Sequence, residues 1–199
     1  MVARALARAR VTPNQISILS IFFACVAGCS LSVAGERIRS SASIWLLVAA
    51  AGIQLRLLCN LLDGLLAIEG GLKSKTGDLF NEMPDRVADI LILLAAGVAV
   101  HEQYEWGLTL GVAATILAIL TAYVRLLGGS LGFPQDFRGP MAKQHRMFVL
   151  TVGCLAGAVE SWLHATVWSL VAALSVIIAG CVITLGRRTQ RIVVQLRAR

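Results

Sequence analysis

The sequence predicts an all-α integral membrane protein with six transmembrane helices. Of its 199 residues, 57% are hydrophobic and only 15% are charged, whereas a soluble domain carries more charge and less apolar content. Crossing a bilayer takes about 20 predominantly apolar residues. Apolar runs near this length occur at residues 15–34, 43–62, 84–100, 106–127, 147–164 and 167–186. Because these runs use most of the chain, we expect a single membrane domain over residues 1–199.

The chain begins with a basic segment, MVARALARAR, in which arginine alternates with apolar residues. It lacks the small-residue cleavage site of a signal peptide. We expect either a short amphipathic helix on the membrane surface or a basic end without regular structure. The residues that follow have the pattern of a helix N-terminus. Thr12 is the expected N-cap, Pro13 takes the first helical position, and Gln15 completes a capping box.

Basic and aromatic residues predict the orientation of the six helices. If each run crosses once, one side receives both chain ends and most of the loop charges: Arg4, Arg8, Arg10, Lys73, Lys75, Arg138, Lys143 and Arg146. Only Arg37 and Arg39 lie opposite. Cytoplasmic loops carry such an excess of Lys and Arg, so both termini are expected in the cytoplasm. The net charge of +7 then reflects membrane orientation, and we expect no nucleic-acid partner.

Tryptophans and loop lengths predict how the two ends of the bundle differ. Tryptophans lie at the outer ends of the runs, as in an interfacial aromatic belt: Trp45, Trp106, Trp162 and Trp168. The inner loops, residues 63–80 and 128–146, are longer than the outer ones and contain most of the polar groups. The five cysteines lie inside apolar runs without CxxC spacing, so we expect small buried side chains and no zinc site. Any chemistry is therefore expected at the cytoplasmic face.

The loop between the second and third runs is flanked by oxygen-bearing side chains. Asn60 and Asp63 are three residues apart and share one helix face, while Gly77, Asn81 and Asp85 form a stripe at spacings of four. Two helices joined by a short loop can turn these faces toward each other. Carboxylate, amide and phosphate oxygens are the ligands of Mg²⁺ or Mn²⁺. The pattern predicts a divalent-metal site between the two helices.

Ion pairing is the alternative explanation for these carboxylates. A carboxylate inside a membrane helix costs up to about 2.5–3.5 kcal/mol on insertion scales, so it must bind a cation, pair or contact water. Asp85 or Asp89 could pair with Arg86 or Arg56. We favour pairing for Asp89 and metal binding or catalysis for Asp85.

The same residues resemble the signature of the CDP-alcohol phosphotransferases, which is DxxDGxxAR, eight residues, then GxxxDxxxD. The matching frame consists of Asn60, Asp63, Gly64, Ala67 and Ile68, then eight residues, then Gly77, Asn81 and Asp85. The spacing agrees throughout, and the family's six-helix pattern extends the resemblance over nearly the whole chain. The chain departs from the signature at Asn60, Asn81 and Ile68, which replace two aspartates and an arginine. This combination resembles a variant branch of the family.

The resemblance implies a function, a set of ligands and a location. We expect transfer of a substituted phosphate, such as a phosphatidyl group, from a CDP-linked lipid to a small alcohol, with release of CMP. Asp85 is the expected catalytic base. One or two Mg²⁺ or Mn²⁺ ions are expected on four residues: Asn60, Asp63, Asn81 and Asp85. The small residues Gly64, Ala67 and Gly77 are expected to contact the nucleotide. A homodimer in the cell inner membrane, with a cytoplasmic active site, is also implied.

The replaced aspartates and the second inner loop refine this expectation. An amide can still bind a hard cation, but without charge, so metal affinity should fall; Asp78 could compensate. Basic side chains near the fourth and fifth runs are expected to bind an anionic part of a substrate: Arg125, Arg138, Lys143 and Arg146. Plain positive-inside charge is the alternative for each of them. His145 is expected to be an interfacial side chain rather than a catalyst.

Two other classes of function remain open at this point. The replacements at Asn60, Asn81 and Ile68 also fit a family member without turnover, which would bind a nucleotide-lipid or a partner membrane protein. A small transporter fits less well, because its ionisable residues would lie near the middle of the membrane. Here the polar residues gather at one end of the runs.

Overall fold

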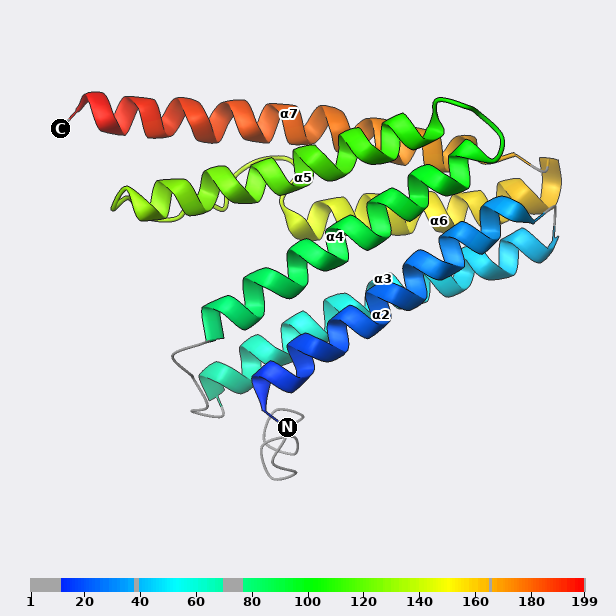
Figure 1. Ribbon diagram of the computed structural model, residues 1–199, viewed down its shortest axis with the longest axis horizontal. Coiled ribbons are helices and arrows are strands. Elements are labelled where there is room, and N and C mark those ends of the chain that lie inside the picture. Colours follow the sequence, from blue (N-terminus) through cyan, green and yellow to red (C-terminus); the bar gives the residue numbers. More distant parts are fainter. Residues whose placement is uncertain (1–11, 38–39, 70–76, 165, 199) are drawn as a thin grey trace.

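The structure is a computed structural model that describes residues 12–37, 40–69, 77–164 and 166–198. These residues form six α-helices: α2 (Pro13–Glu36), α3 (Ser40–Glu69), α4 (Gly77–His101), α5 (Gly107–Ser130), α6 (Lys143–His164) and α7 (Trp168–Arg197). Successive helices run in opposite directions, so the start of α2 and the end of α7 lie toward the same end of the bundle (Figure 1). The predicted amphipathic segment at residues 1–10 lies outside the described residues.

The six helices pack in a bundle in which some contacts join helices that are not adjacent in the sequence. Helix α2 packs on α3 and α4, α3 on α6, α4 on α5, and α7 on both α5 and α6. This arrangement brings the far end of α3, the start of α4 and the start of α6 together, although 74 positions separate residues 69 and 143. The end of α3, the starts of α4 and α6 and the end of α5 therefore all lie toward the left side of the fold in Figure 1.

All six predicted apolar runs are helical, and each helix extends beyond its run. In the described part of the chain, five helices are long and apolar enough to cross a membrane, and α4 is not among them. The first half of α4 carries Asp85, Arg86 and Asp89, which lower its hydropathy. The helical extent of α7, which continues through the basic tail to Arg197, was not predicted.

Local sequence determines how α2 begins. The Thr12 backbone N–H donates to Gln15 Oε1 at 2.9 Å, and the Gln15 N–H donates to Thr12 Oγ1 at 3.3 Å. Pro13 occupies the first turn, where its missing N–H leaves no helical bond unmade. The predicted capping box is therefore confirmed.

The end of the bundle where α6 ends and α7 begins is closed by polar caps and aromatic rings. The Glu160 carboxylate accepts hydrogen bonds from the backbone N–H groups of Trp168 and Ser169, both at 2.8 Å, and so caps the N-terminus of α7. Tyr104, Trp106 and Trp168 stack nearby, with ring centroids 5.0–6.5 Å apart. All four tryptophans lie at this end of their elements, as predicted.

Small residues allow the helices to approach closely. Gly97 of α4 and Gly111 of α5 face each other, and a Cβ added to Gly97 would lie 2.6 Å from the Gly111 Cα. Such close backbone approach is the usual way that membrane helices gain packing contacts.

The expectation of buried cysteines is confirmed for Cys59, Cys154 and Cys181 and is wrong for Cys25 and Cys29, which are exposed. The last two lie on the outward face of α2, where an apolar side chain contacts lipid at no cost.

A buried ionic cluster joins three helices. Asp89 of α4 accepts a hydrogen bond from Arg146 Nη2 of α6 at 2.7 Å, and its other oxygen lies 3.6 Å from Arg56 Nη2 of α3. Arg146 also donates to the Thr121 hydroxyl of α5 and to the Met141 carbonyl. The side chains of Asp89 and Arg56 are fully buried. The predicted pairing of Asp89 with Arg56 is confirmed, and Arg146 is an additional partner.

Replacing Gly97 with alanine should destabilise the protein, because the new Cβ would overlap the Gly111 backbone. Overpacking of this kind costs about 1–3 kcal/mol of unfolding free energy. Unfolding in mixed detergent micelles, followed by circular dichroism, measures the loss. Gly186→Ala is the matched control, because a Cβ there meets nothing within 4 Å. Equal stability of the two variants would contradict the close contact of α4 with α5.

Replacing Asp89 with asparagine should cost more, because two buried guanidinium groups would lose their shared carboxylate. Breaking a buried ion pair costs about 3–5 kcal/mol. The same micelle unfolding experiment measures it. Asp136→Asn is the control, since Asp136 pairs with the exposed Arg191 and surface pairs contribute at most about 1 kcal/mol. A loss no greater than that of the control would show that the cluster does not hold the helices together.

Candidate active site

A pocket of about 370 Å³ opens beside the start of α6, where α4, α5, α6 and α7 meet. Its lining is rich in charged side chains: Glu82, Asp85, Arg86, Arg125, Lys143, His145, Arg146 and Arg188. Basic groups outnumber acidic ones in this lining, so the pocket suits an anion. Asn81 and Phe137 line it as well.

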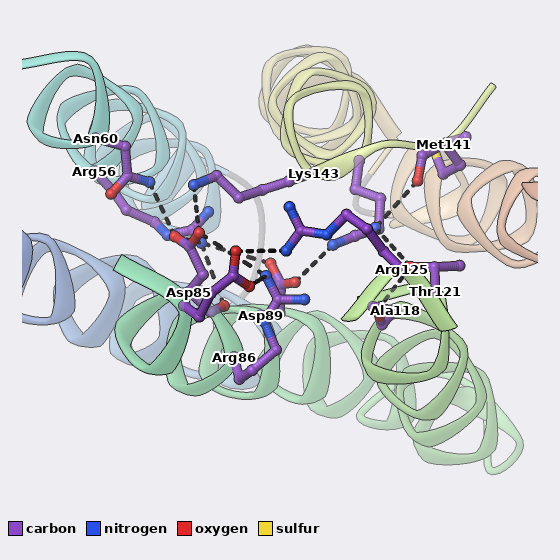
Figure 2. Close-up of polar contacts among 12 residues, drawn as sticks. Arg56, Asn60, Asp85, Arg86, Asp89, Ala118, Thr121, Arg125, Met141 and Lys143 are labelled. Atoms are coloured by element: carbon purple, nitrogen blue, oxygen red, sulfur yellow. Dashed lines mark hydrogen bonds and ion pairs between the residues drawn. The ribbon is translucent and has the colours of Figure 1, made fainter. Parts of the chain in front are cut away.

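Asp85 lies at the boundary between this pocket and the end of α3. Its Oδ1 accepts from Arg56 Nη2 at 3.3 Å and from the Asn60 side-chain amide at 3.2 Å, and its Oδ2 lies 2.5 Å from Lys143 Nζ. Figure 2 shows these groups converging on Asp85 from α3 and α6. The carboxylate is only 5% exposed. Both of its oxygens therefore have cationic partners supplied by the chain itself.

Asp63 lies near Asp85 and is held by a different helix. The Ser17 hydroxyl of α2 donates to Asp63 Oδ2 at 2.6 Å, and the Asp63 side chain is buried. Asn60, three residues earlier on α3, donates directly to Asp85, whereas Asp63 bonds to α2 and is not part of the pocket lining. The structure therefore joins Asn60 to Asp85, as the spacing of the sequence predicts.

The other signature residues lie around this centre. Asn81 is exposed at the edge of the pocket, four residues before Asp85 on α4, and Gly77 is the first residue of that helix. A Cβ added to Gly64 would meet nothing within 4 Å, so there is open space beside the Asp63 turn. The side chains of Ala67 and Asp78 lie outside the described part of the structure.

The basic residues named from the sequence divide into two groups. Arg125, Lys143 and Arg146 line the pocket, and Arg125 forms an ion pair with Glu82 at 2.5 Å. The Arg138 side chain is 75% exposed, pairs with Asp136, and is not part of the lining. His145 is exposed at the pocket edge.

Two residues of the site were missed in the sequence. Arg188 of α7 is buried, lines the pocket, and donates to the Thr121 and Arg138 carbonyls. It belongs to a basic tail that has the composition of a membrane-flanking cluster, so nothing in the sequence separated it from its neighbours. Ser17 lies in the apolar run of α2, and only the packing of α2 against α3 reveals its contact with Asp63.

The donor set fits one hard divalent cation. Asp63 and Asp85 are carboxylates on two different helices, and Asp85 already accepts the Lys143 ammonium group at 2.5 Å. Within the described residues, no three His, Cys, Asp or Glu side chains converge as a metal cluster. Because asparagine replaces aspartate at positions 60 and 81 of the signature, amide oxygens and substrate would have to complete the ligand shell.

Comparisons with known proteins identify two relatives of this chain. The chain is similar to the phosphatidylinositol phosphate synthase of Mycobacteroides abscessus, with 27% identity over 94% of this chain and 79% of that protein. It is also similar to the inner membrane protein YnbA of Escherichia coli, with 26% identity over 80% of this chain and 76% of that protein.

Solved structures share the fold. The phosphatidylinositol phosphate synthase of Mycobacterium tuberculosis in complex with manganese and citrate aligns with a TM-score of 0.78 and 19% identity, covering 96% of this chain and 87% of that one. The same enzyme with CDP-DAG bound aligns with a TM-score of 0.76 and 21% identity, covering 96% and 91%. The sequence profile of one family matches residues 10–185. The chain therefore belongs to the CDP-alcohol phosphatidyltransferase family.

Proposed function

We propose that this protein transfers a substituted phosphate from a CDP-linked lipid to an alcohol acceptor, with release of CMP, in phospholipid synthesis. Membership of the family supports this reaction class. The observation that carries the proposal for this chain is the position of Asp85. Its carboxylate lies between the acidic face of α3 and a basic pocket large enough for a small phosphorylated molecule.

In the proposed reaction Asp85 is the catalytic base. The acceptor hydroxyl attacks the lipid-bearing phosphorus of the diphosphate, a new P–O bond forms, and the P–O bond to CMP breaks. The hydroxyl proton passes to the Asp85 carboxylate, which is the role of a positioned general base. Asp85 can serve both the acceptor and the donor because it lies at the boundary between the pocket and α3.

A divalent cation, Mg²⁺ or Mn²⁺, is the proposed cofactor, held by Asp63 and Asp85 with the amide oxygens of Asn60 and Asn81. When bound, such an ion supplies positive charge that stabilises the diphosphate and the leaving CMP. The chain itself contributes binding and orientation. The open space at Gly64 gives the nucleotide access to the turn that carries Asp63, and Ala67 and Gly77 are proposed to line the same path.

The basic pocket is the proposed acceptor site. Arg125, Arg146 and Lys143 come from two helices and approach one volume, and guanidinium groups bind phosphate with two parallel hydrogen bonds. These residues favour an acceptor that carries an anionic group. Arg138 is proposed to act at the entrance, since its side chain points into solvent.

The number and orientation of the membrane spans form the next part of the proposal. We propose six spans, α4 included, in a single domain over residues 1–199, with both ends and the pocket on the cytoplasmic side of the inner membrane. The excess of Lys and Arg at that end supports this orientation. The protein is also proposed to form a homodimer. It is proposed to belong to a variant branch of the family that has asparagine at positions 60 and 81.

One observation favours a second candidate, a family member that binds the nucleotide-lipid without turning it over. Both Asp85 oxygens are paired with protein groups, and two signature carboxylates are amides. The experiment on Asp85 separates the two candidates, because it measures chemical transfer. The experiment on Asn60 tests the metal site that both candidates share.

Replacing Asp85 with asparagine should abolish transfer, because the amide cannot accept the hydroxyl proton. We expect a loss of about 100-fold or more, the range of a general base. Transfer of a radiolabelled headgroup from a CDP-linked lipid in proteoliposomes measures it. Asp136→Asn controls for loss of an acidic side chain outside the pocket. Transfer by neither the native protein nor the variants would favour the binding candidate.

Replacing Asn60 with aspartate should tighten Mn²⁺ binding, because it restores a unit charge beside Asp63 and Asp85. At about 4 Å and an effective dielectric of 20 that charge attracts a cation by several kcal/mol. Screening by neighbouring cations leaves an expected gain of about tenfold. Electron paramagnetic resonance of free Mn²⁺ measures the affinity. Gln195→Glu, which adds the same charge near the end of α7, should leave it unchanged. Unchanged affinity in Asn60→Asp would remove position 60 from the metal site.

A further inference from the structure

Lys143 occupies an unusual position for a cation. It is the first residue of α6, and the N-terminus of a helix carries a partial positive charge that disfavours a nearby ammonium group. Its Nζ nevertheless lies 2.5 Å from Asp85 Oδ2. Figure 2 shows the side chain extended from α6 toward Asp85. The Asp85 carboxylate therefore holds this charge in place against the helix dipole.

The charges around Lys143 leave little room for another cation. Among the described residues, the buried and partly buried basic groups around Asp85 are Arg56, Arg86, Arg125, Lys143, Arg146 and Arg188, and the acidic ones are Asp63, Glu82, Asp85 and Asp89. Six basic groups therefore face four carboxyl groups, and Lys143 is part of this positive excess. A divalent cation beside Asp63 and Asp85 would add two more. Such an excess is unfavourable in a site of low dielectric constant, unless Lys143 leaves or an anion enters.

The Lys143 side chain is able to move away from the Asp85 carboxylate, whereas the Arg56 side chain is not. Arg56 is fully buried and contacts the backbone carbonyl and the carboxylate of Asp85 as well as Asp89. The Lys143 side chain is 24% exposed and lines the pocket. Its flexible four-carbon stem allows the ammonium group to turn from Asp85 to an anion in the pocket without movement of α6.

We propose that Lys143 is an internal counter-ion of the metal site. In the free protein it takes the place of the divalent cation beside Asp85. When an anionic group enters the pocket, Lys143 turns to that group, and the carboxylates become available to the metal. This inference rests on the proposed function for the identity of the metal site. Its consequence is coupling: an anion in the pocket and a metal at Asp63 and Asp85 each strengthen the binding of the other.

Mn²⁺ binding to the full chain in detergent tests this coupling without measuring transfer. Electron paramagnetic resonance gives the affinity in sulfate, an anion of phosphate-like shape, and in chloride at the same ionic strength. For the native protein, sulfate should tighten Mn²⁺ binding by about fivefold or more, the usual range of coupling between sites. Lys143→Met should bind Mn²⁺ at least about fivefold more tightly in chloride, and sulfate should add little.

Arg125→Gln is the matched comparison, because it removes the same charge from the same pocket but from the partner of Glu82. It should tighten Mn²⁺ binding in chloride less than Lys143→Met does. Equal effects of the two variants, or a sulfate effect that survives in Lys143→Met, would overturn the proposal. If Lys143→Met lacks the native melting transition, the test uses the native protein alone. Equal Mn²⁺ affinities of the native protein in sulfate and in chloride would then overturn the inference.

The outcomes also separate this inference from the proposed function. Native-like Mn²⁺ binding by Lys143→Met, together with transfer that depends on Asp85, would refute the counter-ion role and leave the enzyme assignment intact. Absence of Mn²⁺ binding in every variant would refute both the counter-ion role and the metal site.

Discussion

The ion pairs between Asp89, Arg56 and Arg146 constrain the rest of the structure. Charges inside an apolar bundle require partners, because neither lipid nor packed side chains can solvate them. These pairs can form only if α3, α4 and α6 adopt one register at their inner halves. Asp85 lies four residues before Asp89 and therefore on the same face of α4. The pairing that fixes the helices thus also directs Asp85 toward Asn60 and Lys143.

The site differs from the four-aspartate signature in how it balances charge. Asparagine at positions 60 and 81 removes two negative charges, and the Asn60 amide donates a hydrogen bond to Asp85 where an aspartate would repel it. Arg56 and Lys143 supply positive charge to the same carboxylate from the protein. Fewer carboxylates and more cationic side chains favour binding of a metal together with an anionic substrate over binding of the metal alone. This balance links the altered signature to the basic pocket.

The two ends of the bundle have different tasks. At the outer end, Glu160 caps α7 and aromatic rings stack against one another, so that end is closed by local contacts. At the inner end, the segment between α5 and α6 is held by the Arg188 hydrogen bond to the Arg138 carbonyl and by the bond from the Met141 N–H to Thr184. These bonds fix the start of α6 and thereby the position from which Lys143 reaches Asp85.

The sequence alone determined the elements of the structure and part of the site. Apolar runs located all six helices, the Thr12–Gln15 pattern determined a helix start, and the spacing of the signature paired Asn60 with the face of Asp85. The first two features depend on the order of residues within one segment, and the third depends on helical periodicity in two segments joined by a short loop. Tertiary structure alone decided that Ser17 contacts Asp63 and that Arg188 enters the pocket. Helical periodicity states which residues share a face, but only the packing of distant helices determines what that face meets.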